Sequence, residues 1–213
     1  MSKKKKIIIT GGLGYIGTEL CKLYSGVSWH HQITVIDNRF ISERVNQIRN
    51  WNIDFIQGDI LDKNLIEKYC KDADIIHHLA GITDVPRTKS QSSDEQDKKI
   101  IEVGEKGTQN ILDVVSDKCK IIFPSTHVVY EGIDEVKTDI SENETTKPVL
   151  SYSISKAFNE TQLKKSGKKY IILRLGSVYG YSTDSMRVDI MPNLFSKIAS
   201  QNGTLKLFAG GRQ

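Results

Sequence analysis

The stretch KIIITGGLGYIG, residues 6–17, decides how this chain folds. Its apolar beginning, Lys6–Thr10, predicts a buried β-strand, and the residues after the glycines begin an apolar pattern typical of a helix. Gly11 allows a sharp turn, Gly14 lets the backbone approach a bound group closely, and Gly17 lets helix and strand pack tightly. The stretch therefore predicts the first strand–turn–helix unit of a dinucleotide-binding fold.

Short runs rich in Ile, Val and Phe recur along the rest of the chain, with helix-like segments between them. The predicted strands are Lys6–Thr10, Ile33–Asp37, Asp54–Gln57, Ala73–Leu79, Lys120–Pro124 and Tyr170–Leu175. The predicted helices are Tyr15–Ser25, Asn64–Cys70, Ser93–Ser116, Tyr152–Lys165 and Asp189–Ser200. Strands that are apolar on both faces and alternate with helices indicate a parallel sheet covered by helices. We therefore predict an α/β fold, a three-layer, doubly wound parallel sheet of the Rossmann type.

Length and composition narrow the class of protein. A chain of 213 residues can bury one α/β core, so we expect one domain, residues 1–213. It lacks a run of roughly 20 apolar residues, which a membrane-spanning helix needs. The net charge of +4 is spread over 30 basic and 26 acidic residues rather than concentrated on a basic face. We expect neither a nucleic acid nor a membrane as partner.

The N-terminus and the cysteines predict the compartment. Lys3–Lys6 and Ile7–Ile9 begin like a signal peptide, but the apolar run ends at Thr10, too early for one. The cysteines form no CxxC pair and occupy apolar-patterned positions, which predicts reduced, buried thiols. They are Cys21, Cys70 and Cys119. Both features predict a cytoplasmic protein.

The glycine stretch and the second strand predict the cofactor. The first turn of the helix, with Tyr15 and Ile16, would hold a pyrophosphate on its N–H groups. The second strand ends at Asp37, followed by Asn38; a carboxylate there accepts from the ribose hydroxyls of NAD and repels the 2′-phosphate of NADP. Arg39 keeps NADP open as the less favoured cofactor, because an arginine can pair with that phosphate. The alternative is that Asp37 only caps a turn.

Two further strand ends fall on the same edge of the sheet. Asp59 and Ile60 follow the third strand, where the Asp59 side chain can meet the adenine amino group. Leu79, Ala80 and Gly81 follow the fourth, where small residues let the backbone lie against the cofactor. The two histidines before them have no other ligand at metal-binding spacing, so we predict no metal site.

A second group of residues predicts catalysis. Tyr152 and Lys156 stand at i and i+4, on one face of a predicted helix. A phenol with a pKa of about 10 is a poor base. The Lys156 ammonium and a positive nicotinamide ring would both favour the phenolate. The predicted strand from Lys120 ends in hydroxyl residues, including Thr126, on the same edge of the sheet.

As a set, these motifs resemble the extended short-chain dehydrogenase/reductases of the NAD-dependent epimerase/dehydratase family. The matching segments occur in family order over nearly the whole chain. They are TGGLGYIG (10–17), Asp37, GDI (58–60), HHLAG (77–81), GTQN (107–110), STHVVY (125–130), Tyr152 with Lys156, and LRLGSVYG (173–180). The resemblance implies NAD as cofactor and a nucleotide-sugar as substrate.

The resemblance also implies a role for each catalytic position. Thr126 would hydrogen-bond the reacting hydroxyl, Tyr152 would take its proton as hydride leaves the same carbon, and Lys156 would hold the nicotinamide ribose. The alternative for Thr126 is a strand-end hydroxyl that caps backbone. The leading hypothesis is an NAD-dependent sugar-nucleotide epimerase. An NAD(P)-dependent carbonyl reductase or dehydrogenase, and a catalytically weak NAD-binding core, stay open.

Some positions depart from the family pattern. His127 and Val128 stand where the family's dehydratases carry an Asp-Glu pair, which argues against dehydration and, since related decarboxylases usually keep the Glu, against decarboxylation. Gly104 and Ser177 each replace a common Asn, so substrate binding is expected to differ from that of common members.

The C-terminal segment, Leu205–Gln213, resembles the family segment that leads into a further strand and much of the substrate lobe. We expect a C-terminally truncated member in which residues 178–213 begin an incomplete substrate-binding lobe, with cofactor binding surviving better than catalysis. The resemblance further implies a homodimer that packs the predicted helices Ser93–Ser116 and Tyr152–Lys165 into a four-helix bundle.

Overall fold

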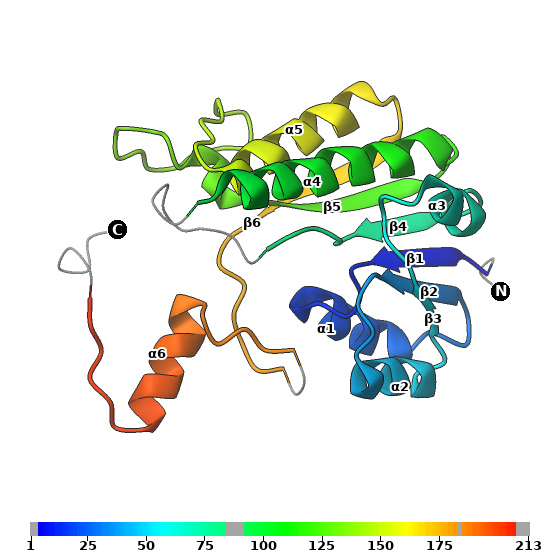
Figure 1. Ribbon diagram of the computed structural model, residues 1–213, viewed down its shortest axis with the longest axis horizontal. Coiled ribbons are helices and arrows are strands. Elements are labelled where there is room, and N and C mark those ends of the chain that lie inside the picture. Colours follow the sequence, from blue (N-terminus) through cyan, green and yellow to red (C-terminus); the bar gives the residue numbers. More distant parts are fainter. Residues whose placement is uncertain (1–3, 84–91, 183–184, 208–213) are drawn as a thin grey trace. The chain divides into compact units, whose positions relative to one another are not determined.

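The computed structural model describes residues 4–83, 92–182 and 185–207 and contains a six-stranded parallel sheet (Figure 1). Its strand order is β3-β2-β1-β4-β5-β6. Strands β2 and β3 lie on one side of β1, and β4, β5 and β6 lie on its other side, so the strand order switches between β1 and β4. This order confirms the predicted doubly wound Rossmann fold. The strands are β1 (Lys6–Thr10), β2 (Gln32–Asp37), β3 (Asp54–Gln57), β4 (Ile75–His78), β5 (Lys120–Thr126) and β6 (Lys169–Leu175).

Helices cover both faces of this sheet, with α1 and α2 on one side and α4 and α5 on the other (Figure 1). The first helices are α1 (Tyr15–Ser25), α2 (Ser42–Asn50) and α3 (Lys63–Cys70). After them come α4 (Asp94–Val114), the 3-10 turn η2 (His127–Tyr130), α5 (Ser151–Lys165) and α6 (Met191–Ser200). Successive residues of β1 point into separate cores: Ile7 and Ile9 pack with α1 and α2, and Ile8 packs with α3, α4 and α5. Burial on both faces explains why the strands are almost continuously apolar.

Some elements differ from the sequence prediction. The sequence analysis missed α2, whose apolar residues Val45 and Ile48 are buried but whose N-cap position, Ile41, carries no capping side chain. It also missed η2, which continues directly from β5. The predicted helix Ser93–Ser116 is confirmed as α4, which is one residue shorter at its start and two at its end. Residues 132–148 contain neither helix nor strand.

The chain divides into two compact units, Met1–Gly176 and Ser177–Gln213. The first contains the sheet, and its cysteines are free and buried, as the sequence predicts. The second contains α6, whose Asn193 accepts a hydrogen bond from Gly180 N at 3.0 Å and donates one to Arg187 O at 2.8 Å. These two bonds hold α6 against the segment that precedes it within the second unit.

Candidate active site

The glycines after β1 shape a tight loop at the carboxyl edge of the sheet. Gly11 has a φ of +70°, and a Cβ there would lie 2.7 Å from Ala80 N. A Cβ at Gly17 would lie 2.5 Å from Gly11 O, so α1 rests directly on the loop. At Gly14 the nearest atoms are Gly11 O at 3.2 Å and an Arg39 nitrogen at 4.0 Å. The structure therefore requires glycine at positions 11 and 17, whereas a Cβ at Gly14 would make one tight contact, with Gly11 O.

The N-terminus of α1 follows the glycine loop directly. Its N-cap residue, Gly14, offers no side-chain acceptor, and its first turn, with Tyr15 and Ile16, contains no acidic residue. The first N–H groups of a helix have no partner within the helix, and together with the helix dipole they favour an anion. The arrangement fits a pyrophosphate at this end of α1.

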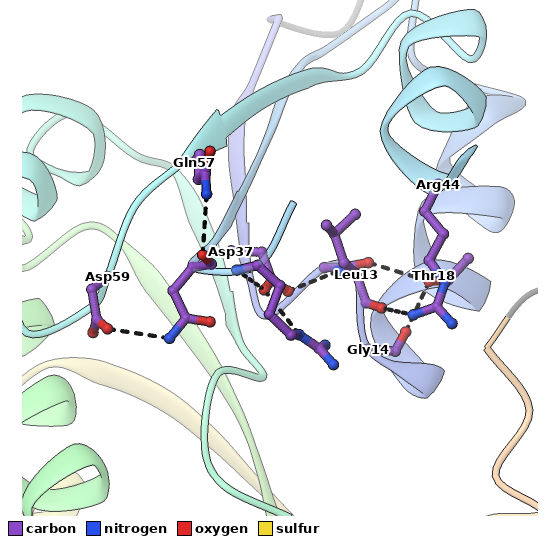
Figure 2. A network of polar contacts seen from close by, with 10 residues as sticks. Leu13, Gly14, Thr18, Asp37, Arg44, Gln57 and Asp59 are labelled. Carbon is purple, nitrogen blue, oxygen red and sulfur yellow. Dashed lines mark hydrogen bonds and ion pairs between the residues drawn. The ribbon is translucent and has the colours of Figure 1, made fainter. Parts of the chain in front are cut away.

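Asp37, at the end of β2, ties the glycine loop to the sheet (Figure 2). One oxygen of its buried carboxylate accepts from Leu13 N at 3.0 Å, and the other accepts from Arg39 N at 3.1 Å. Arg39 Nε lies 3.5 Å from the same carboxylate, on a side chain that is 56% exposed, so this ion pair is weak. The Arg44 guanidinium donates to Leu13 O from α2. Asp37 thus caps the loop and also lies where a ribose would bind.

Asp59, which Figure 2 shows, lies at the rim formed by β2 and β3 and contacts Asn38 there. Asn38 Nδ2 donates to Asp59 Oδ2 at 3.2 Å, and Asp59 Oδ1 accepts from Leu61 N at 2.9 Å. Ile60 lies differently: its side chain is 5% exposed and packs in the core. Only the backbone of Ile60 is therefore available to a cofactor.

The end of β4 is held by a buried polar chain beneath the candidate cofactor site. The Thr10 hydroxyl is hydrogen-bonded to His78 Nδ1 at 2.9 Å and accepts from Ala80 N at 3.2 Å. His78 Nε2 is hydrogen-bonded to the Thr108 hydroxyl at 3.1 Å. Burial, aided by the Lys156 charge, lowers the pKa of His78 to about 3, so its ring is neutral and structural.

Beyond His78, the chain continues through Leu79, which packs against the core, to Ala80 and Gly81 at the rim. A Cβ built at Gly81 would meet no atom of the described residues within 4 Å, which leaves open space there. Within residues 4–83, 92–182 and 185–207, His, Cys, Asp and Glu form no group that could hold a metal ion.

The three candidate catalytic residues approach the same edge from β5 and α5. Lys156 Nζ donates to Pro124 O at 2.8 Å, two residues before Thr126 on β5, and lies 5.8 Å from the centre of the Tyr152 ring. Tyr152 and Lys156 share the lining of a small cavity with Ala80 and Gly81. The structure thus brings the candidate catalytic pair next to candidate cofactor residues that lie about seventy positions earlier.

The surroundings of Thr126 and Lys156 determine which protons these two side chains carry. The Thr126 hydroxyl accepts from Val128 N at 3.3 Å, so it caps η2 and retains its own proton for a substrate. Burial lowers the pKa of the Lys156 ammonium to about 8. A bound anion or a phenolate nearby would favour the charged form of Lys156 again.

A buried ion pair beneath Thr126 was missed by the sequence analysis. Glu160 accepts from the Ser125 hydroxyl at 2.6 Å and from Arg174 at 2.9 and 2.6 Å. These bonds join α5, β5 and β6, and they hold the pKa of Glu160 low although burial raises it. The signal that could have found Glu160 is its spacing, eight residues after Tyr152 and four after Lys156 on one helix face.

The structure also shows what surrounds two of the departures from the family pattern. A Cβ at Gly104 would lie 2.1 Å from the Ser155 hydroxyl, so a larger residue there would require Ser155 to take another rotamer. His127, at a position where dehydratases have a carboxylate, is exposed and has its Nδ1 3.1 Å from Leu175 O. The structure offers no account of Ser177.

The parallel sheet, the glycine loop after β1 and the acid at the end of β2 define a dinucleotide-binding protein of the Rossmann class. Residues 7–213 match the NAD dependent epimerase/dehydratase family. The chain belongs to this family. This match confirms the predicted family. It also confirms NAD as the predicted cofactor, because the family depends on NAD.

The chain is similar to proteins that are named as sugar-nucleotide enzymes. The chain is 32% identical to a UDP-N-acetyl-alpha-D-glucosaminuronate decarboxylase of Bacillus cytotoxicus, over 99% of this chain and 66% of that protein. It is 28% identical to a putative UDP-glucose 4-epimerase of Methanocaldococcus jannaschii, over 97% of this chain and 67% of that protein.

A solved structure supports the fold assignment. UDP-glucuronic acid 4-epimerase from Bacillus cereus, in complex with UDP-glucuronic acid and NAD, is 26% identical with a TM-score of 0.76, over 98% of this chain and 67% of that one. The chain thus spans about two thirds of the length of these relatives. Among the described residues, every helix is too short or too polar to cross a bilayer.

Proposed function

We propose that this chain is the NAD-binding and catalytic core of a sugar-nucleotide epimerase in which Tyr152 is the acid and base. One observation carries the proposal: Lys156 bonds to the strand that ends at Thr126 and lies 5.8 Å from the Tyr152 ring, in a cavity shared with Ala80 and Gly81. A proton carrier, a cation that tunes it and the rim of the cofactor site therefore meet at one edge of the sheet.

The residues at this edge fit NAD. The first turn of α1 and the backbone at Gly14 would hold the pyrophosphate, and Asp37 would accept from the adenosine ribose. Asp59 with Asn38 lies where the adenine would end, and Lys156 would donate to the nicotinamide ribose. When bound, NAD supplies reversible hydride acceptance from a carbon of the sugar.

The chemistry of the chain itself is proton transfer and orientation. Tyr152, as phenolate, would take the proton of the sugar hydroxyl and later return it to the product. Lys156 would stabilise that phenolate, because a positive charge nearby lowers the pKa of a phenol. Thr126 would donate to the same sugar oxygen and fix its position between the two groups.

Decarboxylation of a uronic-acid sugar nucleotide is the second candidate, because the decarboxylase from Bacillus cytotoxicus is 32% identical over nearly the whole chain. A carboxylate placed β to a newly formed ketone can leave as carbon dioxide without a carboxylate base. His127 and Val128 therefore argue against dehydration more strongly than against decarboxylation.

Proton NMR of the purified chain with NAD and a panel of nucleotide-sugars tests the proposal. The panel includes UDP-glucose, UDP-glucuronic acid and UDP-N-acetylglucosaminuronic acid. Inversion at a ring carbon without net reduction of the cofactor supports the epimerase. Loss of carbon dioxide identifies a decarboxylase, and net formation of reduced cofactor identifies a dehydrogenase. NAD binding with none of these changes leaves a cofactor-binding core and contradicts the proposal.

We extend the proposal to the assembly and compartment. Hydrogen bonds from Asn159 and Gln162 to α4 backbone pack α4 against α5, and the outer face of α5 exposes Ile154 and Phe158 by 42% and 43%. These apolar residues support a homodimer through α4 and α5, which light scattering on a Phe158→Lys variant would test.

We further propose that Ser177–Gln213 begins a substrate-binding lobe and that the buried free thiols belong to a cytoplasmic protein.

A further inference from the structure

The first turn of α5 carries Tyr152, and the N-cap position of this helix has no capping side chain. Its N-cap residue, Leu150, has no side-chain hydrogen bond to the helix, and its first turn contains no acidic residue. Other helices in the same unit begin differently, since Asp62 caps α3 and Ser93 caps α4. An uncapped first turn frays easily, because its N–H groups have no partner within the helix.

Glu131, from another part of the chain, binds the backbone that enters α5. Its Oε1 accepts from Val149 N at 2.9 Å and from Leu150 N at 2.8 Å. The same oxygen accepts from the hydroxyl of Ser153, which is completely buried. Glu131 therefore binds both the backbone that enters α5 and the residue next to Tyr152.

Glu131 also belongs to the segment that follows Thr126. Its own N–H donates to Val128 O at 3.1 Å and closes η2, the turn that Thr126 caps. Two backbone bonds beside it join the same two segments: Lys147 N to Val129 O and Gly132 N to Lys147 O, both at 2.8 Å. A short path of hydrogen bonds thus runs from Thr126 through Glu131 to the first turn of α5.

The acceptor is a charged one. Partial burial raises the pKa of Glu131, but the hydrogen bonds from Ser153, Leu150 and Val149 outweigh it and hold that pKa below its usual value. Hydrogen bonds to a carboxylate are roughly twice as strong as neutral ones. At neutral pH the contact therefore consists of charge-assisted bonds, which favour one fixed geometry.

We propose that Glu131 is a positioning residue, which fixes the Tyr152 phenol relative to Thr126 by anchoring the start of α5 to the turn after β5. The proposal rests on the proposed function, in which Tyr152 is the acid and base. Catalytic groups are sensitive to placement, and a displacement of about 1 Å can cost about 100-fold in rate. A looser first turn therefore lowers kcat more than it weakens substrate binding.

Three variants test this role in the NAD-bound chain. Glu131→Ala removes the acceptor, Glu131→Gln keeps an acceptor oxygen without the charge, and Glu135→Ala removes an exposed acid from the same loop as a matched control. We expect kcat to fall about 10-fold in Glu131→Ala with KM within about 2-fold. Most of the loss is expected to return in Glu131→Gln, and Glu135→Ala is expected to match the parent chain.

A second readout does not require turnover. The pKa of the Tyr152 phenol is measured by NMR of ring-labelled tyrosine, with its signal assigned by its loss in Tyr152→Phe. Displacement from the Lys156 charge raises that pKa in Glu131→Ala. Removal of a negative charge alone leaves it unchanged or lowers it in Glu131→Gln. The two variants therefore separate position from charge.

Three outcomes would overturn the positioning role. The phenol pKa falls equally in both Glu131 variants, which would mean that only charge matters. The melting temperature falls while kcat and the phenol pKa stay unchanged, which would mean that Glu131 only stabilises the fold. KM rises while kcat is constant, which would place Glu131 in substrate binding. A parent chain that binds NAD without turnover contradicts the proposed function instead, and the phenol pKa then still decides the role of Glu131.

Discussion

The N-termini of α1 and α5 differ in the source of the anion that suits each of them. Both helices begin at residues without a capping side chain, Gly14 and Leu150. At α1 neither a capping side chain nor an acidic residue in the first turn occupies the helix end, which suits an anion from outside the protein. At α5 the protein provides its own anion, the Glu131 carboxylate. A helix end that binds a ligand has to stay open, whereas a helix end that carries a catalytic side chain benefits from being fastened.

The largest expected effect comes from a variant that removes the catalytic group at the N-terminus of α5 and leaves the N-terminus of α1 unchanged. Tyr152→Phe removes the proton carrier and leaves the helix intact, so we expect kcat to fall by about 100-fold to 10,000-fold. The dissociation constant of NAD is expected to stay within about 3-fold, because most contacts with NAD lie at α1 and β2. NMR turnover and NAD titration measure both, with Tyr170→Phe on β6 as the control. Equal activity in the two variants would remove Tyr152 from the mechanism.

The next largest effect comes from a variant that disturbs NAD binding at the N-terminus of α1 and leaves α5 unchanged. A methyl group at Gly14 would have 3.2 Å to its nearest protein atom but would project into the space assigned to the pyrophosphate. We expect Gly14→Ala to weaken NAD binding by about 10-fold to 100-fold, which is about 1.4–2.8 kcal/mol. The melting temperature is expected to fall less than in Gly17→Ala, because the contact with Gly11 O is 3.2 Å rather than 2.5 Å. Calorimetric titration and thermal unfolding measure these.

Gly17→Ala is the matched variant, because it separates loss of NAD binding from loss of thermal stability. Its Cβ would lie 2.5 Å from Gly11 O, so the loop itself has to move and both NAD affinity and thermal stability fall. If Gly14→Ala lost as much stability as Gly17→Ala, the backbone at Gly14 would not be a ligand site.

A smaller effect concerns charge at the α5 end. Burial lowers the pKa of Lys156 in the folded chain to about 8 from its ordinary value of 10.5, so the fold disfavours the ammonium form. The resulting loss of stability is fully present below pH 8 and is relieved as pH rises from about 8 towards 10.5. In the absence of NAD, the parent chain should therefore gain about 1–2 kcal/mol relative to Lys156→Met between pH 7 and pH 9.5. Urea unfolding at both pH values measures the difference, and an unchanged difference would mean that Lys156 keeps its ordinary pKa.

The smallest effect concerns a helix end that has its own cap. Asp62 accepts from Leu65 N at 3.1 Å and caps α3, away from both candidate functional ends. Asp62→Ala should cost about 1 kcal/mol of stability, as lost caps usually do. NAD affinity and turnover should not change. A loss of activity here would show that capping affects the site through global stability, and would weaken the distinction drawn for Glu131.

Local sequence patterns were enough to predict the sheet and the positions of the main candidate site residues within it. Each strand is a local apolar run, and the glycine loop is a local pattern, so both are readable from neighbouring residues. Strand ends such as Asp37 and Thr126 could be assigned to one edge, because parallel strands share their carboxyl edge. The pair Tyr152 and Lys156 could be assigned to one helix face by spacing alone.

Tertiary structure decided the contacts between distant segments. Glu131 reaches Ser153 across 22 positions, and Glu160 reaches Ser125 across 35, with no local pattern that links the partners. The helix α2 was missed for the same reason, because packing on the sheet, rather than a cap or a long apolar stripe, stabilises it. Local patterns specify which element forms, but a carboxylate finds its partners only when folding brings them together and removes the water that would otherwise bind them.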